Sequence, residues 1–390
     1  MSTRVGTGDP GFSGDGGPAL RAALNEPKGL ALDRKGHLFI ADSENHVVRR
    51  VDRLTGIITT VVGVAPESAP SPAAHEAPTV PYDAADPFAE AGQSTTDKYT
   101  QQTDLSGTVR YLVGAAAPKR FGGDGGPASQ ALLNFPTAVA VDEEGHLYIA
   151  DTMNHRVRRV DAQTGIITTV AGTGQARYSG DGGPAHQAAL NEPAALAVDA
   201  DGQLYIADQS NNRVRAVDLK TGLIRTVAGT GTAAYDGDNK PATESTVAGP
   251  SGVILGPDGL YIADTFNGRI RCVSLSTGLI TTLVGDGGSY RYQAPDEPAS
   301  PSLSRPSGIA VDHEGNLFLT DSDSHLIRRW DRKTRQLSRI AGTGSASLSG
   351  DGGAAQDAAL CYPFGIAADR DGTLLVADTF NHRIRALSLE

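Results

Sequence analysis

The sequence has little of what several common protein classes require. Only two of its 390 residues are cysteine, Cys272 and Cys361, so a fold stapled by disulfides is not indicated. No apolar run approaches the roughly 18 residues that a membrane-spanning helix needs. No signal-peptide pattern opens the chain, so the compartment stays open, with the cytoplasm favoured. One Trp and nine Phe predict cores built from Val, Ile, Leu and Ala.

Positive charge is also scarce. The formal net charge is -11, which argues against a broad, non-specific nucleic-acid surface, because phosphate binding needs clustered cations. The sequence contains neither a Gly-x-Ser-x-Gly elbow nor a His-Glu-x-x-His motif. Common hydrolase chemistry therefore finds no support in local motifs.

What is present is a repeat. The stretch Leu147–Asp161 occurs six times, and the Asp that ends its Ile-Ala-Asp run serves as a marker. The markers are Asp42, Asp151, Asp208, Asp264, Asp321 and Asp378. The first interval is 109 residues and the others are 56 or 57. A fixed period of this size indicates stacked supersecondary units.

Each repeat holds four short runs rich in Val, Ile, Tyr and Thr. In the second copy the runs begin near Ala138, Leu147, Arg156 and Ile166, and Gly, Asp or Asn separates them. Runs of five or six such residues between turn formers predict strands, and none is long enough for an ordinary helix. Six units of four antiparallel strands predict an all-β, six-bladed β-propeller.

The motifs resemble those of NHL-repeat propellers. The resemblance rests on Asn-x-Pro-x-Gly at 25–29, Ile-Ala-Asp, Asn-His-Arg-Ile-Arg at 381–385 and Thr-Gly-x-Ile-x-Thr. It covers about five sixths of the chain, everything except 64–107. It implies the propeller fold, but that family includes protein-binding, RNA-binding and enzymatic members, so it leaves the function open.

The two ends of the sequence predict how the ring closes. The sixth repeat stops at Leu389-Glu390, after its third strand. The opening residues 2–8 resemble the outer-strand run 168–174. We therefore expect residues 2–6 to supply the outer strand of the last blade and to pair an otherwise open edge.

The chain 1–390 is expected to be a single propeller domain. The expected blades span about 6–63, 115–172, 173–229, 230–285, 286–342 and 343–390 plus 2–6. Residues 64–107 form an acidic insertion rich in Pro and Ala, which should emerge on the channel-mouth face. Long connections in compact proteins are usually functional or disordered, and Tyr82, Phe88 and Tyr99 would give this one something to bury.

An arginine follows every marker Asp by seven residues. The six arginines are Arg49, Arg158, Arg215, Arg271, Arg328 and Arg385. Because the Asp ends one strand and the Arg lies on the next, each pair can meet across its hairpin. Six copies of one charged pair indicate architecture, so we expect these pairs to fasten the blades.

Histidine follows the Asn of the turn in four repeats. These residues are His46, His155, His325 and His382, with Asn212 and Gly268 at the other two positions. A zinc site needs three or four ligands within about 2.0–2.3 Å of the metal, and residues in separate blades do not converge. We expect hydrogen-bonded turn residues, no metal site and no cofactor.

Four repeats also carry a Gly-Asp-Gly-Gly stretch. Its aspartates are Asp15, Asp124, Asp181 and Asp351. The stretch lacks the acidic density of a calcium loop and the Lys-Ser/Thr ending of a phosphate loop. Asp-Gly favours turns, so a turn is the interpretation adopted.

A binding site is expected where the repeats differ, because a ligand is asymmetric. The inner strands begin at the channel mouth, beside the turns that follow the markers. The candidate ligand-binding residues there are Glu26, Lys28, Glu44, Phe135, Glu192, Phe266, Arg291, Arg305, Asp323, Tyr362, Phe364 and Phe380. Apolar walls with a few charges suit a small polar ligand or a peptide, with Arg305 at its anionic end. The alternative is a mouth filled with water.

Two functions from different classes are compatible with this mouth. The first is a monomeric module that binds a peptide, a protein or a small polar or anionic ligand, with no part for nucleic acid or membrane. The second is a divalent-metal-dependent lyase or hydrolase, resembling peptidyl-hydroxyglycine amidating lyases or, in architecture only, gluconolactonases. For that enzyme the sequence offers at most Glu26 and Glu192 with Asn25 or Asn191. RNA binding, a third possibility, conflicts with the net charge. Whether the protein is an enzyme stays open.

Overall fold

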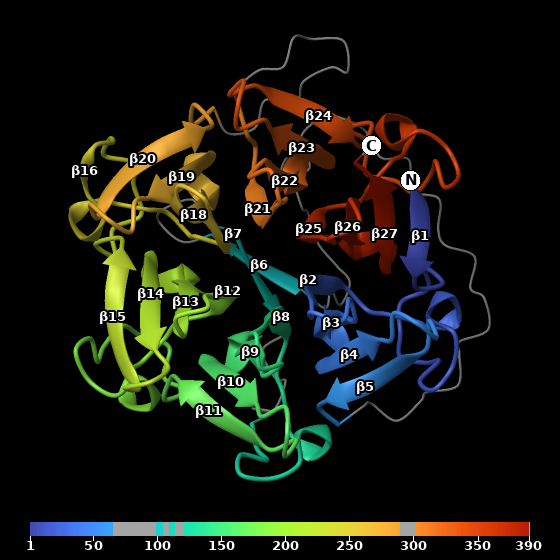
Figure 1. Cartoon of the computed structure of the whole chain (residues 1–390), viewed down its shortest axis with the longest axis horizontal. Coiled ribbons are helices and arrows are strands. Elements are labelled where there is room, and N and C mark those ends of the chain that lie inside the picture. Colours follow the sequence, from blue (N-terminus) through green and yellow to red (C-terminus); the bar gives the residue numbers. More distant parts are fainter. Residues whose placement is uncertain (65–98, 104–108, 114–120, 289–301, 390) are drawn as a thin grey trace. The chain divides into compact units, whose positions relative to one another are not determined.

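The computed structural model describes residues 1–64, 99–103, 109–113, 121–288 and 302–389 (Figure 1). The chain separates into two compact units, Met1–Ala65 with Phe121–Glu390, and Pro66–Arg120. In the first unit, six antiparallel sheets surround a common axis, which confirms the six-bladed propeller. Among the described residues, five of these sheets have four strands, and the fourth blade carries a short additional edge strand.

The strands run from the axis outwards in chain order, except in the sixth blade, whose outermost strand is N-terminal. The first three blades comprise β2 (Pro27–Leu32), β3 (Leu38–Asp42), β4 (Val47–Val51) and β5 (Ile58–Val62); β8 (Pro136–Val141), β9 (Leu147–Asp151), β10 (Arg156–Val160) and β11 (Ile167–Ala171); and β12 (Pro193–Val198), β13 (Gln203–Asp208), β14 (Arg213–Asp218) and β15 (Leu223–Ala228). The last three comprise β17 (Gly252–Gly256), β18 (Gly259–Asp264), β19 (Arg269–Val273) and β20 (Leu279–Val284) with the edge strand β16 (Lys240–Pro241); β21 (Pro306–Val311), β22 (Leu317–Asp321), β23 (Leu326–Trp330) and β24 (Leu337–Ala341); and β25 (Pro363–Ala368), β26 (Thr373–Asp378), β27 (Arg383–Ser388) and β1 (Ser2–Val5).

Two sets of one-turn 3₁₀ helices connect these strands. One set directly follows the marker Asp: η2 (Ser43–Asn45), η4 (Thr152–Asn154), η6 (Gln209–Asn211), η8 (Thr265–Asn267), η9 (Ser322–Ser324) and η11 (Thr379–Asn381). The other set precedes the inner strands: η1 (Ala19–Arg21), η3 (Ala128–Gln130), η5 (Ala185–Gln187), η7 (Ala242–Glu244) and η10 (Ala355–Asp357). No helix among the described residues is long and apolar enough to cross a membrane.

The N-terminal strand closes the ring, as expected. Strand β1 pairs antiparallel with β27, with Ser2 opposite Ala386 and Thr3 opposite Arg385. The pairing continues into the Gly-Asp-Gly-Gly turn of the same blade, where the amide of Gly352 donates to the Met1 carbonyl at 2.8 Å. In the first blade the amide of Gly16 donates in the same way to the carbonyl of Ile58 on β5. The first residues of the chain therefore take the place that an outer strand has in the other blades.

The hydrophobic core lies between neighbouring blades. One buried cluster joins Ala150 and Val157 of the second blade to Leu204 and Ile206 of the third. Similar clusters of mainly Val, Ile, Leu and Ala lie at the following interfaces. The predicted core composition is confirmed, and burial of these faces holds the blades against one another.

The second unit holds a two-stranded sheet of β6 (Tyr99–Thr103) and β7 (Val109–Val113), in which Tyr99 pairs with Val113. Most of the insertion expected at 64–107, including Tyr82 and Phe88, lies outside the described residues. Its placement on the mouth face stays a prediction.

Candidate functional site

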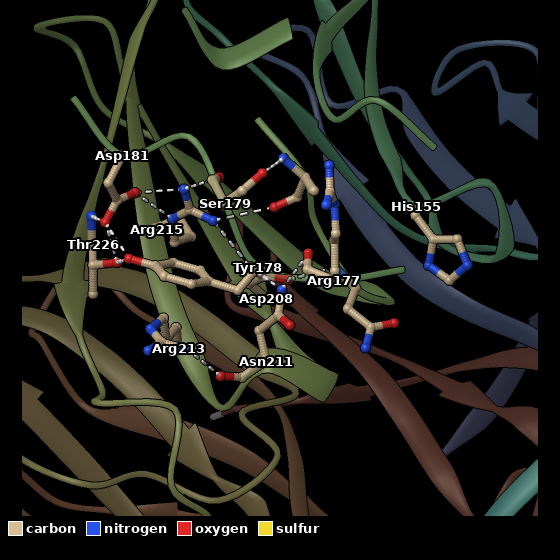
Figure 2. A network of polar contacts seen from close by, with 12 residues as sticks. His155, Arg177, Tyr178, Ser179, Asp181, Asp208, Asn211, Arg213, Arg215 and Thr226 are labelled. Carbon is tan, nitrogen blue, oxygen red and sulfur yellow. Dashed lines mark hydrogen bonds and ion pairs between the residues drawn. The ribbon is translucent and has the colours of Figure 1, made fainter. Parts of the chain in front are cut away.

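The buried interior of each blade is organised around one arginine. The predicted Asp–Arg pairs form in all six blades, with nitrogen–oxygen distances between 3.2 and 3.8 Å. In the third blade, Arg215 contacts the marker Asp208 at 3.3 Å, and both side chains are fully buried (Figure 2). Six equivalent contacts inside six sheets are an architectural feature, as the constant spacing predicts.

In five of the six blades, the described residues include a second carboxylate that contacts the same arginine and that the sequence analysis did not assign. Arg215 donates through Nε to Asp181 of the Gly-Asp-Gly-Gly stretch at 2.8 Å, while Thr226 and Tyr178 donate to the other oxygen (Figure 2). The equivalent carboxylate–arginine contacts are Asp15–Arg49, Asp124–Arg158, Asp238–Arg271 and Asp351–Arg385. The stretch does form a turn, but its Asp also fastens the blade. The nearly constant spacing of 33 or 34 residues between these partners was the available signal.

The pKa values of the two carboxylates that contact Arg215 are shifted in opposite directions. Burial raises the pKa of Asp208 to about 6, although Asn191, Asn211 and Arg215 favour its charged form. Partial burial acts on Asp181 in the same direction, but hydrogen bonds from Thr226, Tyr178 and Arg215, together with the charge of Arg215, lower its pKa overall. Arg215 thus lies between the fully buried carboxylate of Asp208 and the partly exposed carboxylate of Asp181.

At the channel mouth the inner strands form a closed ring, since each contacts the inner strand of the next blade. Lys28 of the first blade lies between three rings there: its Nζ is 4.4 Å from the centre of Phe364, 5.2 Å from Phe135 and 5.8 Å from Phe380. Glu26 Oε2 lies 3.7 Å from the same nitrogen. Burial lowers the pKa of Lys28, against the charges of Glu26 and Glu44. Three blades thus contribute to one enclosed ammonium group.

The fifth blade contributes a second cation, Arg305. Arg305 Nη1 lies 3.8 Å from Asp323 Oδ1, and the guanidinium stands 5.2 Å from the centre of the Phe266 ring. The distance between Arg305 and Asp323 is too long for a hydrogen bond. The Arg305 side chain is 20% exposed, and Asp323 is its one acidic partner among the described residues. The positive charge of Arg305 contributes to the lowered pKa of Lys28, so the two cations interact electrostatically.

The remaining candidates are distributed as follows. We refer to Lys28, Glu26 and the three rings around the ammonium as the Lys28 group. Tyr362 joins this group through an edge-on contact with Phe380, with ring centres 5.3 Å apart. Glu192 accepts a hydrogen bond from Ser210 in its own blade and makes no described contact with Lys28 or Arg305. Arg291 lies outside the described residues. The geometry therefore forms two cation-centred groups from most of the candidates, and their use for a ligand stays a prediction.

The histidines of the turns are hydrogen-bonded, as predicted, but to the neighbouring blade. Nδ1 of His325 accepts the backbone N–H of Tyr362 at 3.2 Å, and Nδ1 of His382 accepts that of Glu26 at 3.2 Å. In the part of the chain that is described, no three His, Cys, Asp or Glu side chains are grouped as metal ligands. The hydrogen bonds of His325 and His382 confirm that these histidines are hydrogen-bonded turn residues.

The opposite end of the channel holds a polar cavity that the sequence analysis did not consider. Its volume is about 280 Å³, and residues of the first, second, third and sixth blades line it. Its carboxylates are engaged: Asp142 accepts the N–H of His146 at 2.8 Å, and Asp369 accepts Arg53 at 3.1 Å. The first contact lies within a hairpin turn, and the second joins the first and sixth blades.

Comparison with known proteins adds to this picture. The model of the teneurin NHL domain matches residues 3–79, 116–179, 173–218 and 281–388. Protein SUPPRESSOR OF QUENCHING 1, chloroplastic, of Arabidopsis thaliana is 32% identical over 275 residues, which cover 68% of this chain and 26% of that protein. NHL repeat-containing protein 2 of Bos taurus is 30% identical over 315 residues, covering 73% and 43% respectively. The chain thus spans less than half the length of either relative.

A solved structure with the same fold comes from Bacteroides thetaiotaomicron, a structural genomics protein of unknown function. It covers 99% of this chain and 75% of its own, with a TM-score of 0.63 and 17% identity. At that identity the likeness shows the fold alone.

Proposed function

Because the chain belongs to the NHL-repeat family of β-propellers, we propose that it is a binding module whose channel mouth holds the anionic group of a peptide or of a small polar ligand. The observation that carries this proposal is the state of Arg305. Its guanidinium faces the mouth, one-fifth exposed, with its acidic partner at 3.8 Å. A planar fork of N–H donors in this state suits a carboxylate or a phosphate, which it can grip in two places.

The surroundings of Arg305 favour a ligand with an apolar portion beside its charge. Phe266 stands behind the guanidinium, and the rings around Lys28 line the adjacent part of the mouth. Sites for small molecules are usually apolar walls with a few placed polar groups, and the mouth has this composition. The four acids at the mouth, Glu26, Glu44, Glu192 and Asp323, oppose a highly charged polyanion such as RNA.

The competing enzyme proposal lacks such an observation. A metal-dependent lyase or hydrolase needs several ligands that converge on one ion, and the described residues group none. Metal content of the purified protein is the direct check. Stoichiometric zinc or calcium that stays bound through a chelator wash would favour the enzyme.

The binding proposal is tested with matched pairs of probes. Short peptides with a free C-terminal carboxylate and the same peptides as C-terminal amides are screened by thermal shift, and the peptides that bind are titrated by calorimetry. We expect the carboxylate form to bind more tightly. Arg305→Ala should lose about 1.5–3 kcal/mol of that binding, the scale of a hydrogen bond to a charged group. This is roughly a 10- to 150-fold loss of affinity.

The control variant is Arg329→Ala. Arg329 lies on the same blade and pairs with an aspartate, Asp331, at 3.2 Å, but it is not a mouth candidate. Its replacement should leave binding unchanged. Equal affinities of the parent and Arg305→Ala would place the site elsewhere, with the cavity at the opposite channel end as the next candidate.

A deletion of residues 66–104 examines the expected cover of the mouth. If the insertion contacts a ligand at the mouth, its removal should weaken peptide binding as Arg305→Ala does. Unchanged affinity in the deletion variant would separate the insertion from the site.

A further inference from the structure

In five of the six blades, the residue before the proline that leads into the inner strand has an unusual backbone conformation. In five blades this residue has a left-handed φ: 49° at Glu26, 52° at Phe135, 53° at Glu192, 52° at Gly249 and 46° at Tyr362. Four of these are not glycine, so the conformation is disfavoured by the side chain. A following proline further restricts the residue, usually to extended values. An external contact must therefore hold it.

That contact is one hydrogen bond from the preceding blade. The backbone N–H of the pre-proline residue donates to a side chain of the turn after the neighbouring marker Asp. The donor and acceptor pairs are Glu26 to His382, Phe135 to His46, Glu192 to His155, Gly249 to Asn212 and Tyr362 to His325, with distances between 2.9 and 3.2 Å. The acceptor is Nδ1 in the four histidines and Oδ1 in Asn212. We refer to these five contacts as the inter-blade bonds.

The sixth interface, between the fourth and fifth blades, supplies a natural control. Its turn carries Gly268 at the acceptor position, where a Cβ would lie 2.7 Å from the carbonyl oxygen of Leu303, so no side chain fits. The pre-proline residue of that interface is Arg305, and it does not have a positive φ. Its N–H donates instead to Asp321, the marker of its own blade, at 3.0 Å. Where the inter-blade bond is absent, the left-handed conformation is absent too.

We propose that His46, His155, His325 and His382 are positioning residues of the mouth, each holding the pre-proline residue of the next blade in its left-handed conformation. Without that acceptor, the N–H turns to the marker Asp of its own blade, as in Arg305. For Tyr362 this alternative acceptor is Asp378, which already accepts the N–H of Cys361 at 2.7 Å. Each inter-blade bond thus selects between two arrangements, both of which occur in this molecule.

Three of the five positioned residues belong to the group of side chains around Lys28. Glu26 pairs with Lys28, Phe135 lies beside its ammonium, and Tyr362 contacts the Phe380 ring. Three inter-blade bonds, from His382, His46 and His325, therefore converge on one part of the mouth. The inference rests on the proposed function for its effect on ligands, but the backbone change it states is independent of any ligand.

The acceptor role requires an unprotonated Nδ1, so the arrangement depends on pH. Burial lowers the pKa of His325 to about 4. The Tyr362 ring meets the His325 ring edge-on, with ring centres 4.5 Å apart, and Asp323 lies two residues earlier in the same turn. For His382, burial lowers the pKa, Glu26 and Asp9 oppose that shift, and Arg383 adds to it. At neutral pH the buried rings are thus available as acceptors.

The test uses two variants at the interface between the fifth and sixth blades. His325→Ala removes the acceptor, whereas His325→Asn restores the side chain that the molecule itself uses as Asn212. Crystal structures of both variants are determined at pH 7.5. In His325→Ala, Tyr362 should have a negative φ, and its backbone N–H should donate a hydrogen bond to Asp378. In His325→Asn, φ should stay near the 46° of the parent. Retention of the left-handed Tyr362 in His325→Ala would overturn the proposal.

Solution measurements cover the case in which His325→Ala does not fold. The Tyr362 amide and Cα resonances of the parent, followed from pH 7.5 to 4, should titrate with the His325 ring, whereas those of His325→Asn should not. Tyr362 resonances that do not change when His325 is protonated would also overturn the proposal. The effect on ligands is read separately, with the C-terminal carboxylate peptides. If Tyr362 moves but peptide affinity does not change, positioning stands and Tyr362 takes no part in peptide binding, whereas the proposed function itself is decided by Arg305→Ala.

Discussion

Arg215 and Arg305 place the same side chain, each with an aspartate, in two different settings. Arg215 is fully buried inside the third blade and bonds Asp181 through Nε at 2.8 Å, with Asp208 at 3.3 Å and backbone carbonyls around it. Arg305 is partly exposed at the mouth, and its one acidic partner among the described residues is 3.8 Å away. A saturated set of contacts indicates architecture, whereas an unsaturated one leaves capacity for a ligand.

The same contrast separates the framework from the mouth in general. Framework residues recur at fixed positions in the repeats, and each buried arginine pairs with the marker Asp of its own blade. Mouth residues differ between blades, and their charges are loosely paired and backed by aromatic rings. The following predictions test this division, beginning with the framework, where the largest effects are expected.

Removal of residues 1–8 should have the largest effect. It deletes β1, which pairs with β27, and it removes Thr3, which donates to the network carboxylate Asp351. The sixth blade would then expose an unpaired edge, which promotes association between chains. We expect loss of a cooperative thermal transition and the appearance of aggregates in size-exclusion chromatography. A truncated chain that stays monomeric and melts like the parent would refute the role of β1 in closure.

Replacement of Arg215 by Met should destabilise the fold by about 3–5 kcal/mol, because Asp208 would stay buried without its cation. Chemical denaturation measures the loss of unfolding free energy. Arg225→Met is the control, since Arg225 lies on the outer strand of the same blade and is exposed. It should change stability by no more than about 0.5 kcal/mol. Peptide binding per folded molecule should survive in Arg215→Met, and its loss would move this arginine from framework to site.

The inter-blade bonds predict a smaller effect that depends on pH. The pKa of His325 is about 4 in the folded chain and 6.5 when unperturbed. Above pH 6.5 the ring is neutral in both states, and its full contribution to stability is present. As the pH falls from 6.5 toward 4, the unfolded chain takes up a proton that the folded chain does not. Stability is therefore lost across this window, by about 2 kcal/mol between pH 7 and pH 5 for one such ring.

The buried aspartates act in the opposite direction. The pKa of Asp208 is raised to about 6, so its protonation favours the folded state as the pH falls below that value. The measurement must therefore compare variants that share these aspartates. The difference in unfolding free energy between the parent and His325→Asn should change by about 2 kcal/mol from pH 7 to pH 5, with the parent losing more. If this difference in unfolding free energy were the same at pH 7 and pH 5, the pKa of His325 would not differ between the folded and unfolded states.

The sequence predicted the framework more completely than the mouth, for a physical reason. The six-fold period specified the blades, and the seven-residue spacing of Asp208 and Arg215 specified a contact across one hairpin, where register decides the neighbours. The Asp181–Arg215 contact joins residues 34 positions apart, and the bond from His325 to Tyr362 crosses between blades. Such contacts depend on how far each sheet is rotated against the next. Local spacing does not contain that rotation.

At the mouth, the ring of candidate residues followed from the topology, but their grouping did not. Lys28 turns toward the rings of Phe364 and Phe135, which belong to the blades on either side of it. That choice is one of several rotamers open to a long side chain, and packing against the neighbours selects it. Glu192 bonds Ser210 within its own blade instead of joining the other candidates.

The smallest expected effect on stability completes the comparison at Arg305. The guanidinium is partly exposed and its ion pair with Asp323 is long, so the pair should contribute no more than about 1 kcal/mol. Arg305→Ala should thus unfold within about 1 kcal/mol of the parent, whereas Arg215→Met should lose several times as much. Denaturation of both variants, measured in the same buffer and with Arg329→Ala as a further reference, provides the ratio. If Arg305→Ala were as destabilised as Arg215→Met, Arg305 would belong to the framework, and any loss of peptide affinity in that variant would reflect unfolding instead of a lost ligand contact.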